Sequence, residues 1–221
     1  MANIIFISLS QHDTAMYGGE EEALKKARNQ CSSGNNSGAI ETLEAYLVND
    51  PHNNKVRMEL ANIAFKNMML NYSIMQLEII LDLDPDNLDA RKALLTIYKG
   101  DKHTIRQAKE QFDYLLERYP DNPDYLNSYA IFCRMQLLDN KKAEEYYRKA
   151  IEIDPDKSIY HMNLAILLVS DLKRYDEGRA ELEKAIELDP DNEYAKDALH
   201  KLMVKKYPKE LPKKRLFSRR K

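Results

Sequence analysis

The sequence of 221 residues contains no tryptophan, only six glycines and only two cysteines. Cys31 and Cys133, about a hundred residues apart, do not make a disulfide framework, so we expect a reducing compartment. This predicts a cytoplasmic protein, or a nuclear one if the source has a nucleus. Glycines are also too few for a phosphate-binding loop. The adjacent pair Gly18-Gly19 precedes three glutamates, which would repel a phosphate.

Long apolar runs are missing as well. No run approaches the roughly 18 residues of a transmembrane helix. The apolar run near the N-terminus, Ile4 to Ile7, is too short for the core of a signal peptide, and no lysine or arginine precedes it. We therefore expect no transmembrane segment and no export.

The side chains that catalysis or metal binding needs are scattered. None of the five histidines has a second histidine or cysteine at the spacing of metal ligands. Paired carboxylates such as Glu144 and Glu145 stand four residues before Arg148 and Lys149, which is how a solvated helix face stabilises itself. We therefore predict that the protein is not an enzyme and holds no cofactor or metal.

The formal net charge of −2 hides an asymmetry. The last 17 residues, 205–221, carry nine basic residues and one glutamate, a net charge of +8, which leaves −10 for the first 204. The chain is thus predicted to have an acidic body and a basic end.

A repeat organises that body. Five prolines recur at intervals of 34, 35, 35 and 35 residues: Pro51, Pro85, Pro120, Pro155 and Pro190. A small residue stands twelve positions before each proline: Ala39, Ser73, Ala108, Ala143 and Gly178. A large apolar residue follows each small one after four positions: Leu43, Leu77, Phe112, Tyr147 and Leu182. Such pairs share one helix face, where the small residue admits a neighbouring helix. Proline then prevents the helix from continuing, so each unit is predicted to be a helix, a turn and a helix.

These phased units resemble the tetratricopeptide repeat (TPR) family, most clearly in "AEEYYRKAIEIDPDK" (143–157) and "GRAELEKAIELDPDN" (178–192). The resemblance implies an all-α fold, a right-handed α-solenoid of antiparallel helix pairs whose first helices line a concave groove. We predict five repeats, over residues 20–53, 54–87, 88–122, 123–157 and 158–192. An amphipathic helix over 193–204 is predicted to cap the last repeat. Residues 1–19 are expected to be a flexible segment, and 205–221 a disordered basic tail.

The resemblance also indicates which residues face the groove: Lys55, Met58, Asn62 and Phe65; Lys92, Thr96 and Lys99; Asn127, Ile131 and Arg134; Met162, Asn163, Ile166 and Val169. Asparagine amides can donate to and accept from a peptide backbone, and apolar neighbours can select its side chains. We therefore predict a protein-interaction scaffold that binds a peptide or helix of a partner, one with an acidic stretch beside an apolar one. The alternative is that Ile131, Met162 and Ile166 simply pack between repeats.

Two alternative functions follow from the family resemblance and from the basic tail. Family members that bind the acidic C-termini of heat-shock chaperones use a clamp of lysine, asparagine and arginine. Neither possible frame of this sequence assembles that clamp, and Asp124 would repel the carboxylate, which makes a co-chaperone the less favoured reading.

The basic tail suggests an assembly factor recruited to nucleic acid or to a larger complex. The residues concerned are Lys213, Lys214, Arg215, Arg219, Arg220 and Lys221. They can contact phosphates, serve as a nuclear address or hold to an anionic membrane surface. They can equally be a solvated tail that keeps an acidic body soluble.

Overall fold

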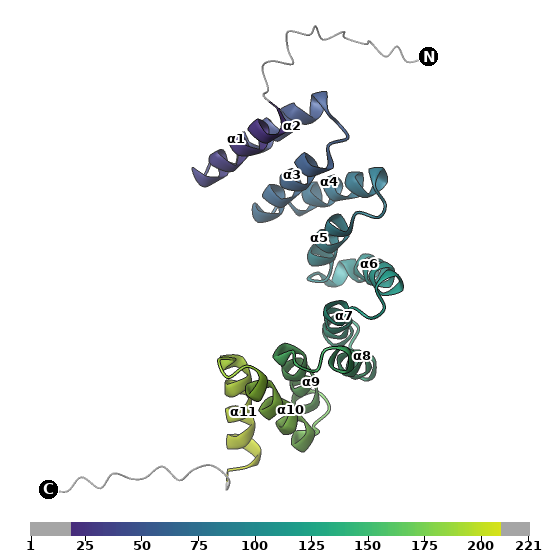
Figure 1. Cartoon of the computed structure of the whole chain (residues 1–221), viewed down its shortest axis with the longest axis vertical. Helices are drawn as coiled ribbons and strands as arrows, with labels where there is room; N and C mark the ends of the chain where they lie inside the picture. Colours follow the sequence, from purple (N-terminus) through teal and green to yellow (C-terminus); the bar gives the residue numbers. More distant parts are fainter. Residues whose placement is uncertain (1–18, 209–221) are drawn as a thin grey trace, which may run out of the picture. The chain divides into compact units, whose positions relative to one another are not determined.

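The computed structural model describes residues 19–208, so the N-terminal segment and the basic tail from residue 209 onward lie outside the described residues. Within the described range the chain forms eleven α-helices and one short 3-10 helix, and no strand. Within each compact unit, consecutive helices pack as antiparallel pairs joined by short turns, α1 with α2 and α3 with α4, and α7 with α8 and α9 with α10 (Figure 1). The predicted all-α architecture of helix pairs is therefore confirmed over these residues.

The chain divides into two compact units, Met1–Asp101 and Lys102–Lys221. The helices of the first unit are α1 (Glu20–Ser32), α2 (Asn36–Asn49), α3 (Asn54–Lys66), α4 (Leu70–Leu83) and α5 (Leu88–Tyr98). Those of the second are η2 (Lys102–Thr104), α6 (Ile105–Arg118), α7 (Pro123–Met135), α8 (Asn140–Ile153), α9 (Ser158–Ser170), α10 (Tyr175–Leu188) and α11 (Glu193–Lys206). The boundary falls inside the third predicted repeat, and a single array over residues 20–204 stays a prediction.

The recurring prolines occupy one kind of turn. In the first such turn, Asp50 to Asn53, the backbone N–H of Asn53 donates to the carbonyl of Asp50, which places Pro51 second in a four-residue turn. The Asn53 side chain then accepts a hydrogen bond from the N–H of Val56 and caps α3. The same cap recurs at Asn87, Asn122 and Asn192. Each of these turns thus ends one helix pair and starts the next.

The start of α6 differs from expectation. The spacing of Thr104 and Gln107 is typical of a capping box, in which the threonine side chain would cap the helix. Thr104 is indeed the residue before α6, but its side chain makes no capping hydrogen bond, because it ends the 3-10 helix η2 in a conformation (ψ 19°) outside the extended range of the Asn caps.

The core follows the repeat. The small residue is buried in every pair, and so is the large apolar residue four positions later. In the second unit, Phe112 packs against Tyr129 and Phe132, with ring centroids 5.1 Å apart in both cases. Cys133 is fully buried in this unit, and burial raises the pKa of its thiol to about 11. Cys31 packs, half-buried, against the core of the first unit.

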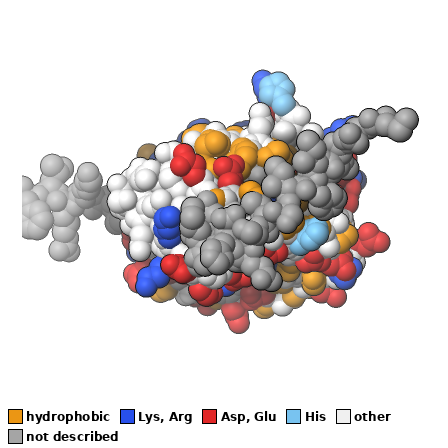
Figure 2. Space-filling model, turned by 90° about the horizontal axis from the view of Figure 1, so that it is seen from above, with side chains coloured by type: hydrophobic (Ala, Val, Ile, Leu, Met, Phe, Trp, Pro, Cys, Tyr) orange, Lys and Arg blue, Asp and Glu red, His pale blue; other side chains and the backbone are white. Residues whose placement is uncertain are grey.

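The surface is charged. Acidic and basic side chains are interspersed over the face seen in Figure 2.

Between residues 19 and 208, none of the helices combines the length and the apolar character that crossing a bilayer requires.

Candidate functional site

The candidate site lies in the second unit, where three helices, α7, α9 and α11, begin at intervals of 35 residues. Two of the predicted groove residues meet at the junction of α7 and α9. The side-chain N–H of Asn163 donates to the side-chain oxygen of Asn127 over 3.0 Å, and Asn127 is only 8% exposed. The two side-chain amides that were expected to bind a peptide backbone are therefore hydrogen-bonded to each other.

Arg134, at the C-terminal end of α7, is also engaged within the chain. Its Nε lies 2.5 Å from Oδ2 of Asp171, the residue after α9. Both side chains are largely covered, with 21% and 31% exposed. The positive charge predicted for the groove at Arg134 is therefore neutralised by a neighbouring carboxylate.

The next junction, between α9 and α11, has the same register but different side chains. The position of Asn127 is taken in α9 by Met162, and the position of Asn163 is taken in α11 by Ala198. The position of Arg134 is taken by Val169. Alanine is too short to reach across the junction, and neither methionine nor valine can make the polar bridges that join α7 to α9. The junction of α9 and α11 is therefore left open.

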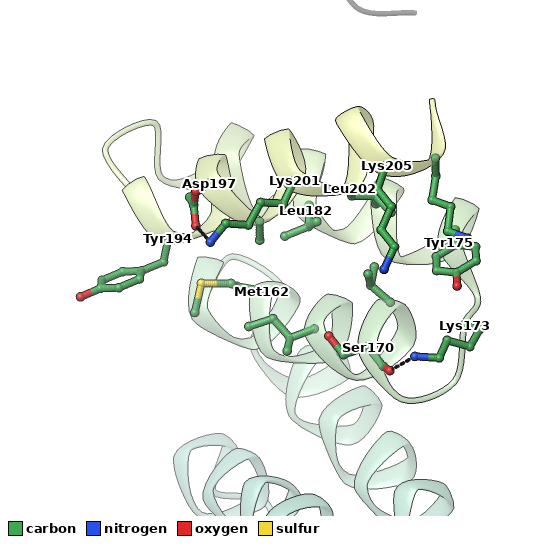
Figure 3. A pocket seen from close by; sticks show the side chains of 14 residues that line it. Met162, Ser170, Lys173, Tyr175, Leu182, Tyr194, Asp197, Lys201, Leu202 and Lys205 are labelled. Carbon is green, nitrogen blue, oxygen red and sulfur yellow. Dashed lines mark hydrogen bonds and ion pairs between the residues drawn. The ribbon is translucent and has the colours of Figure 1, made fainter. Parts of the chain in front are cut away.

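The opening is a cleft of about 560 Å³, which we call the end cleft. Its apolar wall is formed by Met162, Ile166 and Val169 of α9, with Leu182 of α10 behind them and Ala198 and Leu202 of α11 opposite (Figure 3). Met162 is 9% exposed, so it is also part of the core, whereas Ile166 and Val169 are half-buried. Tyr194 stands at the mouth and is 82% exposed. The volume falls in the range of about 300–1,000 Å³ that is usual for ligand pockets.

Lysines border the end cleft. Lys201 pairs with Asp197 over 2.5 Å, Lys173 donates to the backbone carbonyl of Ser170, and the ammonium of Lys206 lies 4.2 Å from the centre of the Tyr175 ring. Lys205 reaches from α11 toward α9, and it has no ion-pair or hydrogen-bond partner within residues 19–208 (Figure 3). Four lysines and one aspartate thus border the apolar wall of the end cleft.

The predicted groove residues of the first unit are spread over α3 and α5. Lys55 lies 2.6 Å from a carboxylate oxygen of Glu20 and 2.7 Å from one of Glu21, at the start of α1. These hydrogen bonds raise the pKa of Lys55, and the bond from Lys55 lowers the pKa of Glu20. The other predicted groove residues of this unit, on α3, on α5 or directly after α5, are half-buried or exposed: Met58, Asn62, Lys92, Thr96 and Lys99.

The sequence predicts α11 only as a cap, whereas in the structure its side chains also line the end cleft. The signal was present, because α11 begins 35 residues after α9 and therefore has the register of a first helix. Ile131, on α7, is 39% exposed and lies outside the end cleft. No group of three or more potential metal-ligating side chains occurs in the part of the chain that the structure describes.

Comparison with known protein families identifies repeats in this chain. A family described as "TmcB, TPR repeats" matches residues 86–159, and a family described as "Tetratricopeptide repeat" matches residues 134–193. A comparison with curated protein sequences found no match.

Solved structures with the same fold come from several proteins. A tetratricopeptide repeat protein from Parabacteroides merdae has a TM-score of 0.71 at 19% identity, and the match covers 83% of this chain and 72% of that one. TTC0263, a thermophilic TPR protein of Thermus thermophilus, has a TM-score of 0.58 at 19% identity, covering 84% and 100%. A MamA protein has a TM-score of 0.63 at 19% identity, covering 76% and 90%. At these identities the likeness shows the fold.

Proposed function

Because the chain is a tetratricopeptide repeat protein, we propose that it is a non-catalytic scaffold that binds a peptide or helix of a partner protein on the face formed by its first helices. Proteins built of these repeats are generally non-catalytic scaffolds. The end cleft is the observation that carries the proposal for this chain. It is an apolar recess between α9 and α11. At the equivalent positions of α7 and α9, polar side chains join the two helices instead.

The other predicted groove residues support a narrower site than the sequence suggested. Asn127, Asn163 and Arg134 already have hydrogen-bond or ion-pair partners within the chain. A ligand would have to break these contacts before it could bind the three side chains. The apolar residues Met162 and Ile166 line the end cleft and need no such displacement. We therefore assign peptide binding to α9 and α11 rather than to the whole series of first helices.

The proposal is tested by filling the end cleft. Ala198 is half-buried on the α11 wall, and glutamine there would occupy the recess at little cost in helix propensity. Ala180→Gln on the exposed side of α10 is the matched control. Peptides are selected from a random display library against the full chain, and their affinities are then measured by calorimetry.

We expect Ala198→Gln to weaken the selected peptides at least tenfold, and Ala180→Gln to leave their affinity unchanged, with unchanged helical circular dichroism in both variants. Equal binding to the wild type and to Ala198→Gln would overturn the assignment. So would a library that yields no peptide binding better than its scrambled version.

The alternative function, recruitment through the basic tail, depends on Lys213, Lys214, Arg215, Arg219, Arg220 and Lys221, which lie outside the described residues. It remains a hypothesis from the sequence.

A further inference from the structure

We propose that the end cleft selects a partner segment in which two or three apolar side chains lie next to aspartate or glutamate, and that Lys205 is the residue that recognises the carboxylate. The inference rests on the proposed function, which it deepens by naming the chemistry of the partner.

The apolar part of the ligand follows from α9. Met162, Ile166 and Val169 are spaced by four and three residues, so they form one stripe along a single helix face. The stripe is about 10 Å long at 1.5 Å per residue, which accommodates side chains from about two turns of a helical ligand. Apolar side chains that enter the recess leave water, which favours binding. An apolar groove of this kind is the usual docking place for one face of an amphipathic helix.

The acidic part follows from the charges around the stripe. Lys173, Lys201 and Lys206 already have contacts within the chain, so a carboxylate would compete for them. Lys205 has no such partner among residues 19–208 and extends across the cleft (Figure 3). A hydrogen bond between an ammonium and a carboxylate is stronger than a neutral one, and an adjacent apolar wall reduces its screening by water. The binding of a carboxylate at Lys205 is therefore favoured.

Charge also disfavours the two terminal segments of this chain, residues 209–221 and 1–18, as occupants of the end cleft. The segment after α11, residues 209–221, is rich in lysine and arginine, and the like charge of the lysines around the cleft would oppose its entry. Residues 1–18 contain the apolar run Ile4 to Ile7 but a single acidic residue, Asp13. An external segment with adjacent carboxylates fits the end cleft better than either of these.

Synthetic peptides test this directly. Three 18-residue amphipathic peptides share one apolar face of leucines and differ only in the flanking residues, which are all glutamate, all glutamine or all lysine. Their affinities for the full chain are measured by fluorescence anisotropy at low salt. We expect the glutamate peptide to bind about tenfold more tightly than the glutamine peptide, as one well-placed charge pair implies, and the lysine peptide to bind most weakly.

Two variants identify the residue responsible. Lys205→Glu is expected to reverse the order, so that the lysine peptide binds more tightly than the glutamate peptide. Lys141→Glu, which changes an exposed lysine of α8 outside the cleft, is the matched control and should preserve the order. Both variants keep a long polar side chain on a helix surface. An unchanged order in Lys205→Glu overturns the role of Lys205.

The outcomes separate this inference from the proposed function. If the glutamate and glutamine peptides bind equally and Ala198→Gln weakens both, the end cleft is a peptide site without the proposed charge selectivity, and only the inference fails. If no peptide binds, or if Ala198→Gln has no effect, the proposed function fails as well. Phe6→Asp in the full chain tests occupation by the N-terminal segment: tighter binding of all three peptides to this variant would show that residues 1–18 fill the cleft and would overturn the proposal.

Discussion

Asn163 on α9 donates its side-chain hydrogen bond to Asn127 on α7 over 3.0 Å, and this contact closes the junction between two helices whose starts are 35 residues apart. Asn127 is 8% exposed, so its side-chain oxygen has little access to water as a substitute partner. On an isolated helix the side-chain amide of Asn127 could bind a ligand, but here it is used in the packing of α7 against α9.

This contact makes Asn163→Ala destabilising. The variant leaves the buried Asn127 oxygen without its donor, which we expect to lower the free energy of unfolding by about 1–2 kcal/mol. Replacing both residues by alanine should cost less than the sum of the two single changes, because the pair is lost only once. Urea denaturation of the four proteins in this double-mutant cycle measures the coupling. Additive single effects would show that the pair does not interact in solution.

Gly178 offers a sharper test of close packing. Alanine or serine occupies its position in the other four repeats, and alanine favours a helix over glycine by about 1 kcal/mol, so the sequence alone predicts that Gly178→Ala stabilises. In the structure a Cβ at Gly178 would lie 2.4 Å from Cγ2 of Val169, a stiff β-branched side chain, and 3.3 Å from the carbonyl oxygen of Ala165. We therefore expect a net loss of about 1–3 kcal/mol in stability.

Thermal and urea denaturation check this prediction, with Gly100→Ala as the control, because a Cβ there meets only a carbonyl oxygen at 3.8 Å. The double variant Gly178→Ala with Val169→Ala removes the obstructing methyl groups and should recover part of the loss. A stabilised Gly178→Ala protein would mean that the α9–α10 contact is looser than the structure indicates.

Lys157 is the residue before α9, and its side chain makes no capping hydrogen bond. Its backbone angles, φ −89° and ψ 99°, are close to those of Asn122 before α7, φ −85° and ψ 109°, which does cap its helix. The N–H of Tyr160 now donates to the backbone carbonyl of Lys157; an asparagine side chain at 157 should accept from it, as Asn122 accepts from Tyr125, and stabilise the protein by about 0.5–1 kcal/mol. Comparing the denaturation midpoints of Lys157→Asn and Lys157→Ala isolates the cap, because only asparagine supplies the acceptor. Equal midpoints would rule out the cap.

The ion pairs of Glu144 are expected to make the stability of the folded protein depend on pH. Burial by itself would raise the pKa of Glu144, but hydrogen bonds from Arg148 and Arg174 outweigh it and hold the pKa below the ordinary value of 4.5. A carboxyl group whose pKa is lower in the folded state stabilises the protein above the unfolded pKa, and this contribution is lost as the pH falls through the folded pKa. Glu144→Gln should therefore cost about 1–2 kcal/mol at pH 7.

That cost should shrink steadily as the pH falls below about 4.5, because the carboxyl group of Glu144 is protonated first in the unfolded chain and, at lower pH, in the folded protein as well. Urea denaturation from pH 7 to pH 3 measures the difference between the two proteins. Glu117→Gln, at an exposed position on α6, is the control and should show no such trend. A difference between Glu144→Gln and wild type that stays constant across this range would contradict the role of the two arginines.

Much of the fold is predictable from this sequence because its signals are local and repeated. The Asn122-Pro123 dipeptide predicts a capped helix start, and Asn122 caps α7. The small residues at 39, 73, 108, 143 and 178 predict close helix contacts, and all of them are buried. Thr104 has the same kind of local signal as Asn122 and gives no cap, since the conformation of the preceding residues decides whether a side chain can reach the helix N–H groups.

The candidate site was less predictable, because it depends on which side chains meet across a junction. The repeat places Asn127, Met162 and Asp197 at the same position of successive first helices, but it does not say which of them bind each other and which border an opening. Asn127 and Asn163 come together because α7 and α9 pack side by side in one register. Arg134 reads as a free cation in the sequence only because its partner, Asp171, is 37 residues away.

The sequence by itself determined the helix pairs, their period and the residues that pack inside them, since these depend on side-chain size, proline and capping residues within a few positions of one another. The tertiary structure decided which polar groups are already satisfied and where an apolar surface stays open. That decision follows from contacts between helices 35 residues apart, where Asn163 reaches Asn127 but Ala198 is too short to fill the space beside Met162.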